Sequence, residues 1–301
     1  MRYSFLSFFL PFTGYPYRGE RVDCPGCSHG RHFVVASFDR RFKRLPTVAC
    51  ERCGLLFVCP MPTDQELEIY YSKYYRLDYQ AVSTGPTNKH LEKRRREAQM
   101  RFDALNGLLP SSARTLDFGC GSGEFVTMML AAGHDAHGFE PGESYGNYAR
   151  ALHGDRITVK GWKQVEYDQT FDLVTCFHVL EHLNEPHAAL ESMARWAKPE
   201  GFIYIEVPDM APPRNKGFGG FHFGHLTGFN HHNLIVAAAR AGLGPVRMVT
   251  PTGIVFSRDA KVDPEAEAAA GLALTKKYYS DGRASSNYWR YQWSKVVGDR
   301  G

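Results

Sequence analysis

Short apolar runs alternate with longer amphipathic stretches between residues 114 and 258. The runs have the length and the β-branched and aromatic content of buried strands, and the stretches between them repeat their apolar residues at helical spacing. Such alternation predicts a parallel, doubly wound, Rossmann-like α/β sheet with helices on both faces. Predicted strands cover residues 114–118, 134–140, 157–161, 171–179 and 201–208, predicted helices cover 123–133, 143–154, 186–198 and 232–243, and a hairpin over 246–250 and 253–258 completes a seven-stranded sheet.

Helical patterns flank this region on both sides. Thr63 followed by Glu66 is a capping-box pattern, which predicts a helix over 63–79. A charged helix is predicted over 89–109, and one or two helices over 264–297. The chain therefore divides into a flap and small lobe (1–62), a helical linker or cap (63–110), an α/β domain (111–260) and a C-terminal helical segment (261–301).

The charged helix contains the run KRRREAQMR, whose basic residues would suit an RNA-binding surface. Glu92 and Glu97 interrupt the positive charge, and a formal net charge of +4 is too small to indicate a nucleic-acid partner. Apolar residues at helical spacing predict an inward face made of Leu91, Met100, Phe102 and Leu105. The pattern therefore favours a solvated helix that covers the core.

Four of the seven cysteines form two CxxC pairs, CPGC and CERC. Two such turns can bring four thiolates to one point, which is the closed tetrahedral set of a structural zinc site. Residues 32–50 between the pairs read as a β-hairpin. We predict a zinc-ribbon-like lobe with Zn²⁺ held by Cys24, Cys27, Cys50 and Cys53. The alternatives are redox or merely buried thiols, or substitution of a ligand by His29 or His32.

The odd number of cysteines and their CxxC spacing argue against a secreted disulfide scaffold and favour a reducing cytoplasm. The apolar run at residues 5–12 has one preceding basic residue and no small-residue cleavage site. It predicts an aromatic flap or a weak membrane-surface contact in preference to an export signal. No apolar run approaches the roughly 18 to 20 residues of a membrane span. We expect a cytoplasmic protein.

The stretch LDFGCGSGEF places three glycines directly after the first predicted strand of the large sheet. One glycine would suffice for a turn, whereas Gly119, Gly121 and Gly123 together let backbone amides approach a ligand closely. Open α/β sheets bind ligands at the carboxyl ends of their strands. Glu140 ends the next predicted strand, where a carboxylate can accept hydrogen bonds from ribose hydroxyls. A nucleoside-containing cofactor is therefore predicted.

Four motifs together, LDFGCGSGEF, GFEP, FDLVTCFHVLEHL and AKPEGFIYIEVPD, resemble those of class I S-adenosylmethionine-dependent methyltransferases over about residues 112–245. The CxxC pairs, CGLLFVCPMPT and a Tyr-rich helix are similar to methyltransferases of bacterial sugar, polysaccharide and natural-product pathways. The zinc-containing sugar C-methyltransferases among them carry a large additional C-terminal domain that this chain is too short to hold. The resemblance thus favours methyl transfer and counts against C-methylation of a nucleotide sugar.

The resemblance implies S-adenosylmethionine as the cofactor. The implied binding residues are Asp117, Gly119, Cys120 and Gly121 at the methionine end, Glu140 at the ribose, Pro141 in the adjacent turn, Trp162 over the adenine, and Phe177 and His178 beside the sulfonium. Trp162 fits an ordinary core position equally well. A dehydrogenase would need the glycine loop to bind a pyrophosphate, and it would not explain HVLEHL or KPEGFIYIEVP.

Methyl transfer from a sulfonium mainly needs alignment and exclusion of water, and a hydroxyl acceptor also benefits from a base. Residues 208–233 follow the fifth strand on the expected acceptor side and contain four histidines. A His-Leu-then-aromatic pattern in related enzymes fits His225, which we expect to be the base, with His222 and His178 as further candidates. The alternative is that His225 hydrogen-bonds the loop to the sheet.

Glu181 and His182 allow two interpretations. They could hold a divalent metal, as in some related O-methyltransferases, or they could order the wall of the cofactor site, which the pattern favours. The leading functional hypothesis is a small-molecule or saccharide methyltransferase, with transfer to oxygen. The alternatives are an RNA or protein methyltransferase whose zinc lobe binds the substrate, and a non-catalytic cofactor-binding scaffold.

Overall fold

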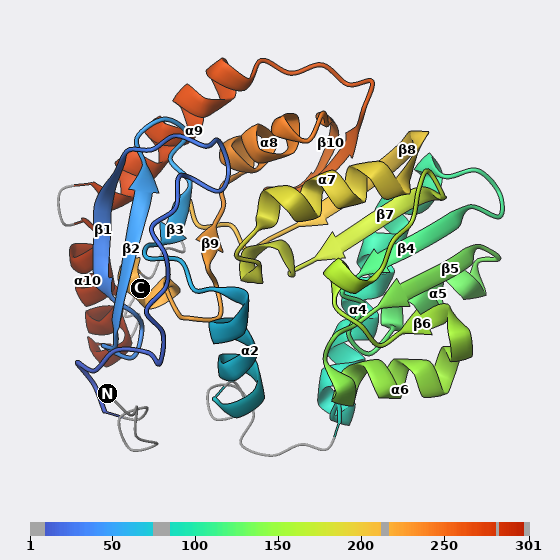
Figure 1. The fold of residues 1–301 in the computed structure, drawn as a ribbon, viewed down its shortest axis with the longest axis horizontal. Helices are drawn as coiled ribbons and strands as arrows, with labels where there is room; N and C mark the ends of the chain where they lie inside the picture. Colours follow the sequence, from blue (N-terminus) through green and yellow to red (C-terminus); the bar gives the residue numbers. More distant parts are fainter. Residues whose placement is uncertain (1–9, 75–84, 212–216, 281–282, 298–301) are drawn as a thin grey trace.

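The computed structural model describes residues 10–74, 85–211, 217–280 and 283–297 (Figure 1). Two sheets organise these residues, one of seven strands and one of four. The larger sheet has the order β10-β11-β8-β7-β4-β5-β6. Its strands are β4 (Arg114–Phe118), β5 (Asp135–Phe139), β6 (Ile157–Thr158), β7 (Phe171–Phe177), β8 (Ala197–Glu206), β10 (Gly244–Thr250) and β11 (Gly253–Ser257).

Neighbouring strands from β6 to β8 run parallel, whereas β11 is antiparallel to both β8 and β10. The prediction of a doubly wound, seven-stranded sheet is confirmed, and the closing hairpin makes the sheet mixed. The chain winds outward from β4 through β5 to β6 and then crosses back to β7 beside β4. The carboxyl ends of β4 and β7 therefore flank the switch point, where sheets of this type bind their ligands.

Helices cover both faces of the large sheet. Side chains of α4, α5 and α6 contribute to the core on one face, and those of α7 and α8 contribute to a separate buried cluster on the other. Their bounds are α4 (Asn88–Leu105), α5 (Glu124–Ala131), α6 (Glu143–His153), α7 (Pro186–Trp196) and α8 (His231–Arg240). Short 3-10 helices connect the elements, namely η1 (Asn106–Leu108), η2 (Gly154–Arg156), η3 (Trp162–Gln164), η4 (Leu180–His182) and η5 (Gly217–Gly220).

Local capping signals explain where two of the helices begin. Thr63 accepts a hydrogen bond from the Glu66 amide at the start of α2 (Asp64–Lys73), and the Glu66 carboxylate accepts one from the Thr63 amide. The predicted capping box is thus confirmed. Asn230 caps α8 in the same reciprocal way with Asn233. These side chains satisfy amides that have no partner inside the helix.

The inward face predicted for α4 is correct at three of its four positions. Leu91 and Leu105 are buried, and Phe102 packs against the core. The prediction is wrong for Met100, which is 65% exposed. Ala98 occupies the buried position instead.

The smaller sheet has the order β1-β2-β3-β9. Its strands are β1 (His32–Phe38), β2 (Arg44–Cys50), β3 (Leu56–Val58) and β9 (Thr227–Gly228). The predicted hairpin is confirmed by the antiparallel pairing of β1 with β2. The fourth strand, β9, comes from the segment between β8 and α8, so the second half of the chain completes the sheet of the first half.

Two C-terminal helices, α9 (Pro264–Tyr279) and α10 (Arg283–Val297), lie beside the smaller sheet (Figure 1). A buried cluster joins this sheet to η5 and both helices; it comprises Val35, Ala49, Leu56, Phe218, Phe221, Tyr279, Ala284 and Tyr288. In the described parts of the chain, no helix is both long enough and apolar enough to span a bilayer.

Candidate active site

The glycine loop after β4 has a backbone that other residues would adopt only with strain. Gly119 and Gly121 have φ values of +74° and +55°, in the left-handed region. A Cβ on Gly119 would lie 2.6 Å from Cγ2 of Val179, whereas a Cβ on Gly121 would have no heavy atom within 4 Å. Gly119 therefore allows close packing of the protein on itself. Gly121 leaves open space, as a ligand cradle requires.

Glu140 closes one side of this loop. Its carboxylate accepts hydrogen bonds from the amide of Gly121 at 3.1 Å and from the amide of Gly142 at 2.8 Å. Burial raises the pKa of this carboxyl, and the two amides partly oppose that rise. A carboxylate has about four acceptor positions. Glu140 is therefore held in place with capacity left for the hydroxyls of a ribose.

Asp117 lies beneath the loop at the end of β4. It is 4% exposed and accepts a 2.9 Å hydrogen bond from the Thr175 hydroxyl on β7. Burial raises its pKa to about 7, although the Thr175 hydrogen bond and the charge of Arg101 pull in the other direction. The neighbouring Cys120 amide donates to the Phe139 carbonyl at 2.9 Å, which ties the loop to β5.

The remaining residues expected at the cofactor line the same edge of the sheet. Trp162 opens η3 half-buried, with its ring centroid 6.3 Å from that of Phe118. Phe177 ends β7 and makes an edge contact with Phe125 at 4.8 Å. Pro141 follows Glu140 directly in the turn before α6. Their contacts to a cofactor stay a prediction.

A charged network that the sequence did not indicate lies at the end of β8. Arg101 of α4 donates two hydrogen bonds to Glu206, at 2.7 and 3.1 Å, and its guanidinium lies 4.3 Å from the centre of the Phe177 ring. The Tyr204 hydroxyl donates to the same carboxylate at 2.9 Å. Although the run 93–101 is rich in basic residues, the Arg101 side chain is largely buried against Glu206. Only the fold brings α4 and β8 together.

His178 connects this network to a histidine cluster. Its Nε2 is 3.1 Å from Glu206, and its Nδ1 is 3.7 Å from Glu181. Burial lowers the pKa of His178, but the two carboxylates outweigh burial and raise it to about 9. Val179, the next residue, is the side chain that packs on Gly119. The histidine cluster therefore lies beside the glycine loop.

The cluster also contains His182, His222 and His225. The ring centroid of His225 lies 4.8 Å from that of His182 and 3.9 Å from that of His222. Burial, followed by the charges of Arg40 and His182, lowers the pKa of His222 to about 3. Burial and the neighbouring histidines lower the pKa of His225 far below its usual range. The three histidines expected to serve as bases, including His178, are thus brought together.

His231 and His232 lie apart from this cluster. They begin α8 directly after its capping residue Asn230, and the Nδ1 atom of His232 lies 2.6 Å from Glu267 of α9.

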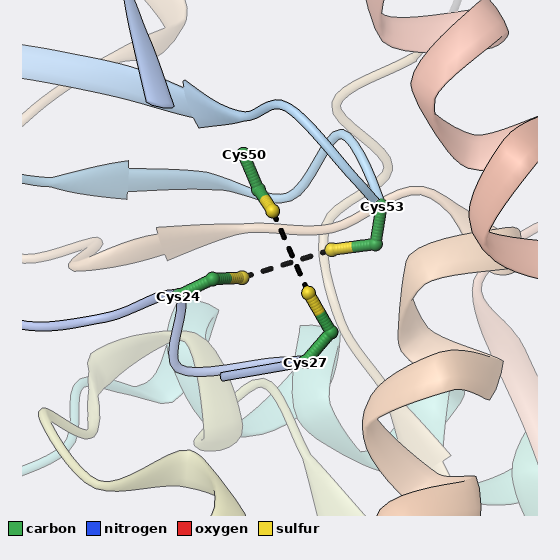
Figure 2. A group of neighbouring side chains, drawn as sticks. All are labelled: Cys24, Cys27, Cys50 and Cys53. Atoms are coloured by element: carbon green, nitrogen blue, oxygen red, sulfur yellow. Dashed lines mark hydrogen bonds between the residues drawn. The ribbon is translucent and has the colours of Figure 1, made fainter. Parts of the chain in front are cut away.

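The four cysteines of the CxxC pairs converge at the end of the smaller sheet (Figure 2). The Sγ atoms of Cys24 and Cys53 are 3.7 Å apart, and those of Cys27 and Cys50 are 3.5 Å apart. Tetrahedral zinc with Zn–S bonds of about 2.3 Å would separate its sulfurs by roughly 3.8 Å. The donor set and its spacing therefore fit a structural zinc ion. Cys59 is buried in the adjoining core.

The profile of the family described as "Methyltransferase domain" matches residues 90–247, just over half of the chain. The chain belongs to this methyltransferase family. The match includes the glycine loop, Glu140 and the histidine cluster. The sequence motifs had predicted this family.

The ubiquinone biosynthesis O-methyltransferase of Bordetella avium is 32% identical over 107 residues, which cover 33% of this chain and 44% of that protein. The protein of the same name from Hahella chejuensis is 32% identical over 124 residues, which cover 38% of this chain and 51% of that protein. The chain thus spans about half the length of the curated relatives it matches.

Solved methyltransferases are similar in fold. A sugar N-methyltransferase from Streptoalloteichus sp. has a TM-score of 0.45 at 19% identity, covering 58% of this chain and 93% of that one. A didemethyltoxoflavin N1-methyltransferase from Burkholderia thailandensis has a TM-score of 0.47 at 17% identity, covering 67% of this chain and 93% of that one. Nothing about the acceptor of this chain follows from that likeness.

Proposed function

We propose that the protein is an S-adenosylmethionine-dependent methyltransferase that acts on an oxygen atom of a small-molecule or saccharide acceptor. The observation that carries this proposal is the open space at Gly121 beside the fixed carboxylate of Glu140. A bare backbone next to an anchored acid suits a nucleoside cofactor with an amino-acid tail. Membership of the methyltransferase family supports the same reading.

In this proposal the bound cofactor supplies the electrophilic sulfonium methyl group. Glu140 accepts hydrogen bonds from the ribose hydroxyls, and the loop at Gly119 and Gly121 holds the methionine portion. Asp117 below the loop attracts the positive charge of that portion. The chain's main task is to align the acceptor oxygen and to exclude water, because the leaving group is already good.

We assign the acceptor to the side of the histidine cluster. His222 and His225 lie on the segment that follows β8, and η4 connects them to the glycine loop through Val179. Their lowered pKa values keep both imidazoles neutral, so the pair can accept a hydrogen bond from an acceptor hydroxyl and, as a weak base, take its proton while the S–CH₃ bond breaks. The assignment rests on the position of the pair between the cofactor loop and the smaller sheet.

We assign a structural Zn²⁺ to Cys24, Cys27, Cys50 and Cys53. A complete set of four thiolates has no open position for a substrate. The lobe nevertheless contacts the histidine segment. The Val58 amide of β3 donates a 2.9 Å hydrogen bond to the carbonyl of Leu226, the residue that follows His225. The metal would thus stabilise the sheet that holds the histidine segment in place.

Incubation with isotopically labelled S-adenosylmethionine and a panel of phenols, nucleotide sugars and glycan fragments, followed by mass spectrometry, tests the reaction. An O-methylated product is expected. His225→Ala should reduce turnover by at least about 100-fold while leaving cofactor affinity unchanged. His232→Ala is the control, since His232 pairs with Glu267 outside the cluster. Cofactor binding without any methylated product would support the scaffold instead, and salt-dependent RNA retention would support a polymer substrate.

A further inference from the structure

The C-terminal helix α10 exposes two tryptophans to water. Trp289 and Trp293 are 59% and 70% exposed, and their spacing of four residues places them side by side on the helix surface. Another face of the helix is already packed, because Ala284 and Tyr288 are buried in the cluster with the smaller sheet. Figure 1 shows α10 at the outer side of that sheet, away from the larger sheet. The two tryptophans therefore add little to the core and leave apolar surface exposed.

Trp289 adjoins aromatic side chains from the N-terminal part of the chain. Its ring centroid lies 6.3 Å from that of Phe42, in the turn between β1 and β2, and the Phe42 ring lies 6.2 Å from that of Phe12. Phe12 is itself 61% exposed. Phe12, Phe42, Trp289 and Trp293 thus form one surface, which we call the aromatic ridge. Exposed apolar surface of this extent usually marks an interaction site.

The segments that carry the aromatic ridge are basic. Residues 32–50 contain four Arg and Lys residues and residues 283–297 contain three, whereas the two segments contain a single acidic residue, Asp39. Asp39 is fully buried and accepts a hydrogen bond from the Tyr15 hydroxyl, so it presents no negative charge at the surface.

Two exposed arginines border the aromatic ridge. Arg44 lies next to Phe12, because the Arg44 amide donates a 2.8 Å hydrogen bond to the carbonyl of Thr13. Arg290 directly follows Trp289 on α10 and is also exposed. The ridge therefore combines large aromatic rings with positive charge at its border.

The apolar run at residues 5–12 ends at the same surface. The sequence predicts an aromatic flap or a weak membrane-surface contact for this run. Residues 5–9 lie outside the described residues, whereas Leu10 and Phe12 are 55% and 61% exposed. The described end of the run thus contributes directly to the exposed apolar surface.

We propose that the aromatic ridge docks on the surface of an anionic lipid bilayer, with Trp289 and Trp293 among the headgroups and Arg44 and Arg290 beside the lipid phosphates. Tryptophan suits this boundary because its ring is apolar while its N–H still finds a polar partner. Basic side chains near the surface are attracted to the negative charge of such a leaflet.

The charge of the aromatic ridge favours lipid over a second copy of this chain. A symmetric dimer would place the same surface of both copies in contact. Arg44 and Arg290 of one copy would then face the same arginines of the other, and like charges repel. An anionic bilayer neutralises these charges instead.

Sedimentation of the full chain with lipid vesicles tests the contact. We expect binding to vesicles of phosphatidylcholine and phosphatidylglycerol in equal parts, and binding at least about tenfold weaker to phosphatidylcholine alone. Trp289→Ser and Trp293→Ser should each weaken binding to the anionic vesicles at least about tenfold. Arg44→Gln and Arg290→Gln should each weaken it about fivefold. Met248→Ser is the matched control, because Met248 is 52% exposed on β10 at the edge of the larger sheet, and it should bind as the unmodified chain does.

Tryptophan fluorescence locates the docked surface. Lipids brominated along their acyl chains should quench the fluorescence of the bound chain. The double variant Trp289→Phe and Trp293→Phe should lose this quenching and still bind the anionic vesicles, because phenylalanine keeps an apolar ring at both positions. A purely structural role of the two tryptophans would produce no quenching. Thermal unfolding should occur at the same temperature in the unmodified chain and in all variants, since each replaced side chain is exposed.

Three results would overturn the proposal. The first is a chain that does not bind anionic vesicles, and the second is binding that the tryptophan and arginine substitutions leave unchanged. The third is a dimer, seen by analytical ultracentrifugation without lipid, that Trp293→Ser dissociates, because the aromatic ridge would then bind a second copy. None of these measurements depends on turnover, so their outcome is separate from that of the proposed methyl transfer.

Discussion

Gly121→Ala is the sharpest test of the cofactor cradle. At φ +55° an added methyl group strains the backbone, but it meets no heavy atom of the protein within 4 Å. The methyl group would instead occupy the space that the proposal gives to the cofactor. Gly119→Ala is less informative, because there the methyl group would collide with Val179 at 2.6 Å and disturb the fold.

The two effects of Gly121→Ala act on different quantities, the folding free energy and the cofactor affinity. A non-glycine residue in the left-handed region costs about 1 to 2 kcal/mol of folding free energy. If the methyl group displaces the cofactor, affinity should fall at least tenfold, which corresponds to about 1.4 kcal/mol or more of binding free energy. Gly242→Ala separates the two, since Gly242 has a φ of +76° with nothing within 4 Å and lies in the turn after α8. It should cost the same folding free energy and no cofactor affinity.

Denaturant unfolding would measure the loss of folding free energy. Calorimetric titration with S-adenosylmethionine or S-adenosylhomocysteine would measure the loss of cofactor affinity. The expected result is equal destabilisation of the two variants, with weakened cofactor binding only in Gly121→Ala. If Gly121→Ala binds the cofactor as tightly as Gly242→Ala does, the loop is a structural turn and the proposed cradle is wrong.

Two further predictions concern protonation and zinc. Burial raises the pKa of Asp117 to about 7, and a positively charged cofactor favours its ionised form, so affinity should rise with pH up to about 7 and then level off. Titrations across that range should show this slope, and Asp117→Asn should remove it; a slope that persists would assign it to another group. Cys50→Ser should lose its chelator-resistant zinc, and its free energy of unfolding should fall by roughly several kcal/mol, because metal binding at a structural zinc site contributes to folding. Elemental analysis and thermal unfolding would check this, with Cys59→Ser as the control that keeps zinc; a Cys50→Ser chain that retains it would contradict the assigned ligand set.

The parts of the fold that depend on neighbours in the sequence could be predicted. Thr63 and Glu66 specify the start of α2 through a reciprocal hydrogen bond over one helical turn. The strands and helices between residues 114 and 258 follow from apolar spacing, since each buries one face or one stripe. The cysteine cluster could likewise be predicted from two CxxC turns joined by a hairpin.

The parts of the fold and of the site that depend on contacts between segments distant in the sequence could not be predicted. The contact between Arg101 and Glu206 joins residues on α4 and β8, and nothing local distinguishes Arg101 from the other basic residues of the helix. Met100 was misplaced for a related reason, because a shift of one or two positions around a helix moves a side chain from the core to solvent. The convergence of His182 and His225 on Glu181 likewise requires the loop after β8 to fold back on η4.

The pairing of β3 with β9 connects the cysteine lobe to the segment that carries His225. β9 is only two residues long, Thr227–Gly228, and it directly follows Leu226, whose carbonyl is bonded to β3 and whose amide is bonded to Glu181. A strand this short gains little stability on its own, so its position depends on the sheet that it joins. The zinc proposed for that sheet would therefore act at a distance: it would fix where His225 lies relative to Glu181, while the glycine loop, anchored by β4 and β5, would keep its shape without it.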